Sequence, residues 1–225
     1  MKHGDLTIDC FVDLAFAENG YVLSTTGEDG APVGWIIDPS FPPQVHNLLE
    51  HVRKNDVRID KVILTHGHAD HIAGLDHVHH AHPEAPILMP ACEHKALQDA
   101  YENLSAHFGL AVAVETRATD DLAPGDQLTL GKLTWNVLDT SGHSPGGRSL
   151  YCAAAGVLIS GDALFAGSIG RTDFPHSDHT SLIRNIRENL LNLPEKTAVY
   201  SGHGDPTSIG AERKSNPFVS DNSNR

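Results

Sequence analysis

The sequence predicts a single α/β domain, because strand-like and helix-like segments mix throughout its 225 residues. Apolar residues make up 40% of the chain, which is enough for a hydrophobic core. No apolar run approaches the roughly 20 residues that span a bilayer, and no linker rich in Pro, Gly and Ser divides the chain. These observations exclude disordered, collagen-like and integral-membrane classes.

The first part of the chain shows short apolar segments separated by turn residues, which are typical of an antiparallel meander. The expected strands are Thr7–Val12, Tyr21–Thr25 and Val33–Asp38. After the prolines at 42 and 43, apolar side chains recur at helical spacing from Val45 to Val52, which predicts a helix. A further strand is expected at Lys61–Thr65.

From there helices and strands alternate. We expect helices at His71–His80, Glu93–Phe108 and Thr180–Leu193. The remaining expected strands are Ile87–Met89, two segments within Gln127–Leu138 that turn at Gly131, Leu150–Cys152, Val157–Ser160 and Ala198–Tyr200. Residues 1–219 are expected to form the domain, and residues 220–225 a disordered tail, since the end of the chain is polar.

Charge and cysteine content restrict the partners and the compartment. The formal net charge of −13 repels phosphate backbones, so nucleic acid is not an expected partner. A membrane is not expected either, because the sequence has no long apolar run. Cys10, Cys92 and Cys152 are widely spaced and include no C-x-x-C pair, which favours a reducing compartment over a disulfide framework. The N-terminal residues lack the apolar stretch of a secretory signal, so we expect a cytoplasmic protein. The oligomeric state stays open.

One local pattern recurs four times: a short apolar run, then Ser or Thr close to Gly and to a His or Asp. The four instances are residues 62–68, 137–143, 157–162 and 199–203. Each is interpreted as a buried strand whose last turn carries a polar ligand. If these strand ends face one edge of the sheet arrangement, the ligands meet there.

The densest of these segments is H-x-H-x-D-H, formed by His66, His68, Asp70 and His71. In an extended loop His66 and His68 point to the same side, while Asp70 and His71 begin the next helix and face a neighbouring position. This arrangement predicts two adjacent metal sites. Asp70 also lies where the amide groups of a helix N-terminus favour a carboxylate.

Together with three later residues, this segment gives the candidate centre seven donors. We assign His66, His68 and His143 to a first site and Asp70, His71 and His203 to a second, with Asp162 as the bridge. Three protein ligands and an open position are typical of catalytic zinc. Two divalent cations with two carboxylates form a cluster suited to polarising a carbonyl oxygen.

The sequence resembles the metallo-β-lactamase-fold superfamily through its H-x-H-x-D-H segment and the segments 142–146, 160–162 and 202–204. Residues 164–175 and 202–218 are similar to the single-domain branch of glyoxalase II, the hydroxyacylglutathione hydrolases. The resemblance implies an αββα sandwich, with two mixed sheets flanked by helices, and two divalent metal ions, zinc and/or iron. It also implies hydrolysis of a small-molecule thioester of the glutathione type, such as S-lactoylglutathione, by a metal-bridging hydroxide.

The resemblance also suggests roles for individual residues. Asp70 is expected to be a ligand that also orients the hydroxide, which makes it the catalytic candidate. Arg171 is a candidate anchor for a substrate carboxylate, with a salt bridge to Asp173 as the alternative. Asp173 stands where related enzymes have Tyr, and Phe174 is a candidate pocket wall. The expected substrate-binding residues are therefore Arg171, Asp173 and Phe174.

Two alternatives remain at this stage. Persulfide dioxygenases share the Gly-Arg-Thr-Asp-Phe string at 170–174 and hold one iron with two His and one Asp, here His66, His143 and Asp162. A metal-buffering protein is the non-enzymatic alternative, since histidines are also dense within Asp76–His82. That segment offers no complete carboxylate or thiolate frame, so a solvated helix face is the simpler interpretation.

Overall fold

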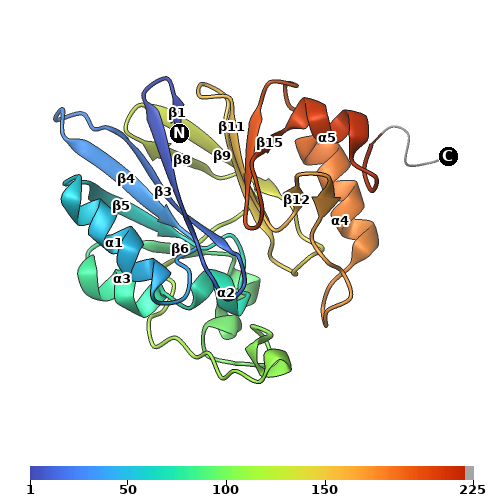
Figure 1. The fold of residues 1–225 in the computed structure, drawn as a ribbon, viewed down its shortest axis with the longest axis horizontal. Coiled ribbons are helices and arrows are strands. Elements are labelled where there is room, and N and C mark those ends of the chain that lie inside the picture. Colours follow the sequence, from blue (N-terminus) through green and yellow to red (C-terminus); the bar gives the residue numbers. More distant parts are fainter. Residues whose placement is uncertain (221–225) are drawn as a thin grey trace.

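The computed structural model describes residues 1–220, which stack as four layers in the order helices, sheet, sheet, helices (Figure 1). The αββα sandwich implied by the sequence resemblance is therefore confirmed. Residues 221–225 of the expected tail lie outside the described residues, whereas Ser220 is buried and donates its backbone N–H to Asn216. Within the described chain, no helix combines the length and the apolar character needed to cross a membrane.

The first sheet joins an antiparallel meander to a parallel half. Its seven strands, in spatial order, are β1 (Lys2–His3), β2 (Leu6–Val12), β3 (Asn19–Thr26), β4 (Pro32–Ile37), β5 (Arg58–Ile63), β6 (Ile87–Met89) and β7 (Asp120–Asp121). Strands β1 to β4 pair antiparallel, and β4 to β7 pair parallel. The meander expected at the start of the chain is present.

The second sheet has six strands and one parallel pair, β11 with β14. In spatial order it contains β15 (Thr207–Ser208), β14 (Ala198–Ser201), β11 (Val157–Gly161), β10 (Arg148–Cys152), β9 (Leu133–Asp139) and β8 (Gln127–Leu130). A separate hairpin of β12 (Leu164–Phe165) and β13 (Ser168–Ile169) follows β11.

Three apolar clusters hold the layers together, and burying such surface contributes roughly 25 cal/mol per Å². Trp35 and Trp135 meet between the two sheets, with ring centroids 5.7 Å apart and both side chains fully buried. The outer face of the first sheet packs against α1 (Gln44–Lys54), α2 (Ala69–Ile72) and α3 (Leu75–Ala81). The outer face of the second packs against α4 (His179–Asn185), the π turn η3 (Ile186–Leu190) and α5 (Ile209–Ser215). Figure 1 shows α1 and α3 on one side of the sheets and α4 and α5 on the other.

The helix expected at His71–His80 is interrupted between α2 and α3. Gly74 stands at the break, where a Cβ atom would lie 2.5 Å from the carbonyl oxygen of Ser40 and 2.7 Å from that of Pro39. The backbone N–H of Gly74 donates to Pro39 at 2.8 Å. This close approach of two backbone segments ends one helix and starts the next.

The prediction of a single helix over Glu93–Phe108 is wrong. Only the 3-10 turns η1 (Ala91–Leu97) and η2 (Ser105–Phe108) form in this region. The Asn103 side chain donates to the carbonyl oxygens of Ala96 and Val112, and Leu104 adopts a left-handed φ of 66°. Hydrogen bonds from the Asn103 side chain to the backbone therefore take the place of regular helical hydrogen bonds. Asn side chains commonly disfavour helices in this way, because they offer backbone groups an alternative partner.

Candidate metal centre and its pocket

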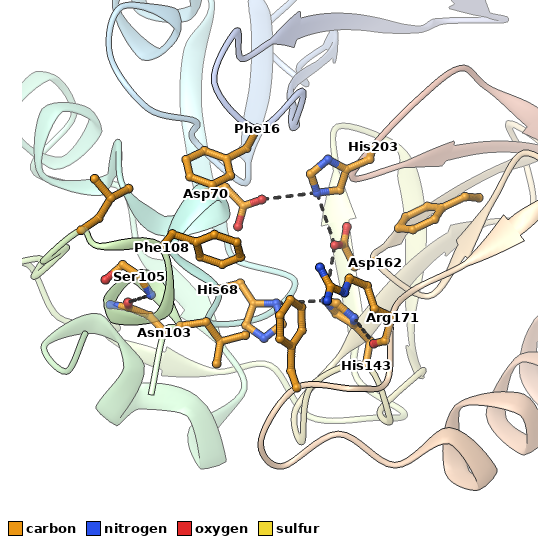
Figure 2. Close-up of a pocket in the computed structure, with 15 residues that line it drawn as sticks. Phe16, His68, Asp70, Asn103, Ser105, Phe108, His143, Asp162, Arg171 and His203 are labelled. Atoms are coloured by element: carbon orange, nitrogen blue, oxygen red, sulfur yellow. Dashed lines mark hydrogen bonds and ion pairs between the residues drawn. The ribbon is translucent and has the colours of Figure 1, made fainter. Parts of the chain in front are cut away.

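All seven predicted donors lie just beyond strand ends at one edge of the sandwich, five of them in loops and two, Asp70 and His71, in the short helix α2. His66, His68, Asp70 and His71 follow β5, and the other three donors, His143, Asp162 and His203, follow β9, β11 and β14. The structure brings the seven side chains together, and Figure 2 shows five of them around a common centre. The repeated strand-end pattern of the sequence therefore corresponds to one place in the fold.

The first group consists of three imidazoles, His66, His68 and His143. The Nδ1 atom of His68 lies 3.0 Å from Nε2 of His66 and 2.9 Å from Nε2 of His143. Tetrahedral zinc with Zn–N bonds of ~2.0–2.1 Å holds its nitrogens about 3.3 Å apart. The three ring nitrogens thus stand close to the spacing of ligands around one ion.

The second group consists of Asp70, His71 and His203. Oδ2 of Asp70 lies 3.3 Å from Nε2 of His203 and 3.9 Å from Nε2 of His71. This group combines one carboxylate with two imidazoles, a donor set that suits zinc and iron equally.

Asp162 lies between the two groups. Its Oδ2 atom is 3.4 Å from Nε2 of His143 in the first group and 3.4 Å from Nε2 of His203 in the second. Its Oδ1 atom is 3.5 Å from Nε2 of His71. A carboxylate in this position can contact both ions, which is the role assigned to Asp162 from the sequence.

A buried carboxylate behind the centre, Asp38, directs two of the histidines. His71 Nδ1–H donates to Oδ2 of Asp38 at 3.0 Å, which leaves the Nε2 lone pair facing the second group. Asp38 also accepts from the backbone N–H and the hydroxyl of Thr65, at 2.7 and 2.6 Å. Because the Thr65 hydroxyl donates to Asp38, it accepts from His66 Nδ1 at 3.1 Å. Both imidazoles are thereby held in the tautomer that exposes Nε2.

Backbone carbonyl groups perform the same task for two other histidines. His143 Nδ1–H donates to the carbonyl oxygen of Arg171 at 2.7 Å, and His203 Nδ1–H donates to that of Ala17 at 3.2 Å. Partners of this kind orient metal-binding imidazoles and raise their basicity. Sequence reasoning missed Asp38 as a member of this centre, although it follows the apolar strand β4 in the same way as the ligands follow theirs.

The protonation states fit metal binding. Burial lowers the pKa of His66 well below its usual range, and burial together with the neighbouring His143 lowers that of His68 to about 3. Burial alone would raise the pKa of Asp162, but the charges of His71 and His203 outweigh it and hold the carboxyl well below its usual range. Neutral imidazoles and an ionised carboxylate are the forms that bind cations. Burial alone would lower the pKa of His71 and His203, but the neighbouring carboxylates raise that of His71 well above its usual range and that of His203 to about 10. These two imidazoles therefore bind a cation by releasing a proton.

The unpaired atoms of the centre support the same conclusion. His71 Nε2 and Asp162 Oδ1 are buried and have no hydrogen-bond partner among the described residues. A single Nδ1 atom of His68 also faces two ring nitrogens, although one imidazole nitrogen carries either one proton or one lone pair. Buried polar atoms without partners are costly, and cations between the two groups would satisfy them. The residues present therefore fit a pair of divalent ions.

A second buried carboxylate, Glu93, joins the two loops that carry the first group. Its side chain accepts from the backbone N–H of Gly67, between His66 and His68, and from that of Gly146, in the loop after His143. A Cβ atom at Gly67 would meet Oε2 of Glu93 at 2.9 Å, so the glycine is needed for this close approach.

Replacing Glu93 with Gln is expected to loosen the first group. The amide keeps one acceptor and turns a donor toward a backbone N–H, which leaves a buried donor unpaired at a cost of about 1–3 kcal/mol. We expect Tm to fall by roughly 3–10 °C and the first ion to be lost about tenfold more readily, as measured by calorimetry and by metal content after dialysis against a chelator. Exposed Glu84→Gln is the control, and a Glu93→Gln protein with unchanged Tm and metal content would contradict this role.

Five of the seven donors form the floor of a pocket of about 360 Å³, namely His68, Asp70, His143, Asp162 and His203. Arg171 and Phe174, two of the three predicted substrate-binding residues, line this pocket, whereas Asp173 is not among its lining residues. Asp173 instead accepts from Nε and Nη2 of Arg171 at 2.9 and 2.7 Å. The alternative salt bridge between these two residues is therefore present in the structure.

The opposite wall comes from two segments that the sequence analysis did not connect with the site. Phe16 belongs to the loop between β2 and β3, and Phe108 ends the turn η2 (Figure 2). Their ring centroids lie 5.8 Å apart. The sequence analysis did not identify Phe108 as a pocket residue because it expected a regular helix here. The irregular backbone of residues 98–112 places Phe108 at the pocket instead.

The histidines of α3 do not form a comparable centre. Among the described residues, no group of three donor atoms within 4.8 Å of one another includes a residue of α3. Asp76 on this helix accepts from the backbone N–H and hydroxyl of Thr116, at 2.8 and 2.6 Å. The solvated helix face remains the better interpretation of Asp76–His82.

Comparison with known proteins gives one family. The model of the metallo-beta-lactamase superfamily matches residues 21–203. A probable metallo-hydrolase of Bacillus subtilis, YqgX, is 37% identical over 185 residues, which cover 82% of this chain and 86% of the relative. The hydroxyacylglutathione hydrolase GloC of Haemophilus influenzae is 33% identical over 220 residues, which cover 97% of this chain and all of the relative.

Solved structures of the same kind superimpose closely. The crystal structure of BLEG-1 B3 metallo-beta-lactamase has a TM-score of 0.85 at 34% identity, covering 95% of this chain and 99% of that one. TTHA1623, solved in a di-iron-bound form, has a TM-score of 0.79 at 29% identity and covers 94% and 100% of the two chains. ETHE1 from Myxococcus xanthus has a TM-score of 0.73 at 26% identity, with 95% and 84% covered.

Proposed function

The chain belongs to the metallo-β-lactamase superfamily, and from this premise we propose that it is a metal-dependent hydrolase of small-molecule thioesters of the glutathione type, such as S-lactoylglutathione. The observation that carries the proposal is the pair of three-donor groups joined by Asp162 on the floor of a pocket. The similarity to a hydroxyacylglutathione hydrolase over nearly the whole chain supports the substrate class.

The proposed centre contains zinc, iron or both, held by His66, His68 and His143 on one side and by Asp70, His71 and His203 on the other. When bound, two such cations polarise a carbonyl oxygen and lower the pKa of water toward neutrality. In hydrolysis a C–O bond to water oxygen forms and the C–S bond breaks, giving a carboxylic acid and a thiol. A thiol of pKa about 8.5 leaves readily as the thiolate, so the reaction needs no strong general acid.

The chain's own residues position these reactants. Burial alone would raise the pKa of Asp70, but the charge of His71 and the hydrogen bond with His203 hold it below its usual range. Asp70 therefore stays ionised and can accept a hydrogen bond from the attacking water, which is the orienting role we assign to it. Phe174 lies beside the first group, with its ring centroid 5.9 Å from that of His68, and lines the pocket in which the substrate would lie.

The ligand in this proposal is a small molecule, and neither nucleic acid nor a membrane takes part. The net charge of −13 opposes both phosphate backbones and anionic lipid surfaces. We place the protein in the cytoplasm, where reducing conditions suit the free thiols of Cys10, Cys92 and Cys152.

The proposal is tested with purified protein loaded separately with zinc and with iron. We expect metal-dependent loss of the thioester of S-lactoylglutathione, with release of one thiol per molecule consumed. A β-lactam is assayed in parallel, since one solved relative is named a β-lactamase. Full loading with two ions but no thioester hydrolysis would refute the proposed function.

Persulfide dioxygenation remains the second candidate, because the 170–174 string is shared with that group and Asp162 lies 3.4 Å from His143. This function predicts one iron per chain and oxygen uptake with glutathione persulfide. Thioester hydrolysis predicts two ions per chain and no oxygen uptake, so metal content and an oxygen electrode separate the two.

A further inference from the structure

Apolar side chains predominate in the pocket lining outside the donor cluster, and the other side chains there include Asn103, Ser105 and Arg171. We define the apolar wall as Phe16, Leu104, Phe108, Leu110, Phe165 and Phe174, all of which line the pocket. Aromatic rings continue across it: Phe16 lies 5.8 Å from Phe108, and Phe108 lies 6.4 Å from Phe174, measured between ring centroids. This surface faces the space in which a substrate would lie beside the proposed metal ions.

The polar side chains beside the apolar wall, Asn103 and Ser105, already form hydrogen bonds with neighbouring backbone groups. Asn103 donates to the carbonyl oxygens of Ala96 and Val112, and its own oxygen accepts from the N–H of Ser105. The hydroxyl of Ser105 accepts from the N–H of Val112 at 3.0 Å. Away from the donor cluster, these groups leave little hydrogen-bonding capacity for a ligand.

The positively charged side chain at the pocket, Arg171, is already paired with a carboxylate. Arg171 is the only Lys or Arg among the described residues that line the pocket. Its guanidinium group pairs with both oxygens of Asp173 and lies 4.2 Å from the ring centroid of Phe174. A substrate carboxylate would therefore compete with Asp173 for this cation.

Two members of the wall are strongly exposed to solvent. Phe108 is 53% exposed and Leu110 is 41% exposed, both at the pocket. Large apolar side chains exposed around a concave site are typical of ligand contacts, because a ligand covers them and removes their surface from water.

We propose that the substrate carries a bulky apolar group, aryl or branched alkyl, next to its thioester, and that the apolar wall binds this group. This inference rests on the proposed thioester hydrolysis and narrows its substrate class. In this arrangement the thioester lies over the donor cluster while the apolar group is enclosed by the Phe16 and Phe108 side of the pocket. Recognition of the glutathione carboxylates then contributes less than contact with the wall.

The test compares two thioesters of the same thiol, S-lactoylglutathione and S-mandeloylglutathione, which differ by a methyl and a phenyl group. We expect kcat/KM to be about tenfold or more higher for the mandeloyl substrate, because the phenyl group buries more apolar surface. Phe108→Ala should lower this ratio at least about threefold. Tyr101→Ala is the matched control, since Tyr101 is an exposed aromatic residue of the same segment outside the pocket lining.

Equal kcat/KM values for the two substrates, or a ratio that Phe108→Ala leaves unchanged, would overturn the inference while leaving thioester hydrolysis intact. If metal-loaded protein hydrolyses neither substrate, the proposed function is wrong. Ligand binding then tests whether the apolar wall recognises a bulky apolar group. In that case calorimetry with the unreactive thioethers S-methylglutathione and S-benzylglutathione is used. Tighter binding of the benzyl compound, lost in Phe108→Ala, supports the apolar wall, and equal binding refutes it.

Discussion

Replacing Asp162 with Asn is expected to lower kcat/KM for the thioester by at least about 10³-fold. The amide has nearly the same shape but carries no charge, and its NH₂ group cannot bind a cation. Asp162 lies 3.4 Å from a histidine of each group. An amide offers a single neutral oxygen, so it would no longer hold two ions together with a negative charge. A loss of about 4 kcal/mol in stabilisation of the transition state corresponds to this factor. Rates are measured in excess metal, with metal content determined on the same samples.

Exposed Asp56→Asn is the matched control, because it makes the same chemical change outside the pocket lining. It should keep both ions and the full rate. An Asp162→Asn protein that holds two ions and reacts within tenfold of the unmodified chain would show that this carboxylate is not the bridge.

Strand and helix periodicities are local features, so the sequence predicts the α/β class from them, whereas the αββα layers are implied by the segments that resemble the family. The sequence also predicts which strand ends carry donors, since each follows an apolar run that must be buried. The four segments from His66 to His203 lie together in the structure for this reason. The metal-ligand roles themselves remain predictions that the experiments above address.

Contacts between distant segments explain what the sequence analysis missed. Asp38, which orients His71, follows the apolar strand β4 but lacks the neighbouring Gly of the recurring pattern, and Glu93, which joins the loops of His66 and His143, follows no strand directly. Glu93 was instead assigned to a regular helix. In the structure its side chain is directed inward to backbone amides of two other loops, so tertiary hydrogen bonds decide its conformation. The wall residue Phe108 was missed for the same reason.

Replacing His66 and His143 together with Ala should abolish detectable hydrolysis and remove at least one ion per chain. The change deletes two of the three ring nitrogens that meet at the first group and leaves only His68 and the proposed bridge, Asp162, which is fewer than the three protein ligands typical of a catalytic site. Hydrolysis is followed by thiol release, and the ions are counted by elemental analysis. Because both side chains are buried, the pair His66→Gln and His143→Gln is measured as well, since Gln fills more of the space that Ala leaves empty.

The matched control is the double replacement of His77 and His80 with Ala on α3, where both histidines are exposed. This protein should keep its tightly bound ions and its rate, because no three-donor group of the described residues includes α3. The opposite pattern, with activity and ions lost only from the α3 variant, would assign the functional metal to that helix and support a metal-buffering protein. Circular dichroism of all variants separates loss of ligands from loss of fold, since only the former leaves the helix and strand signals unchanged.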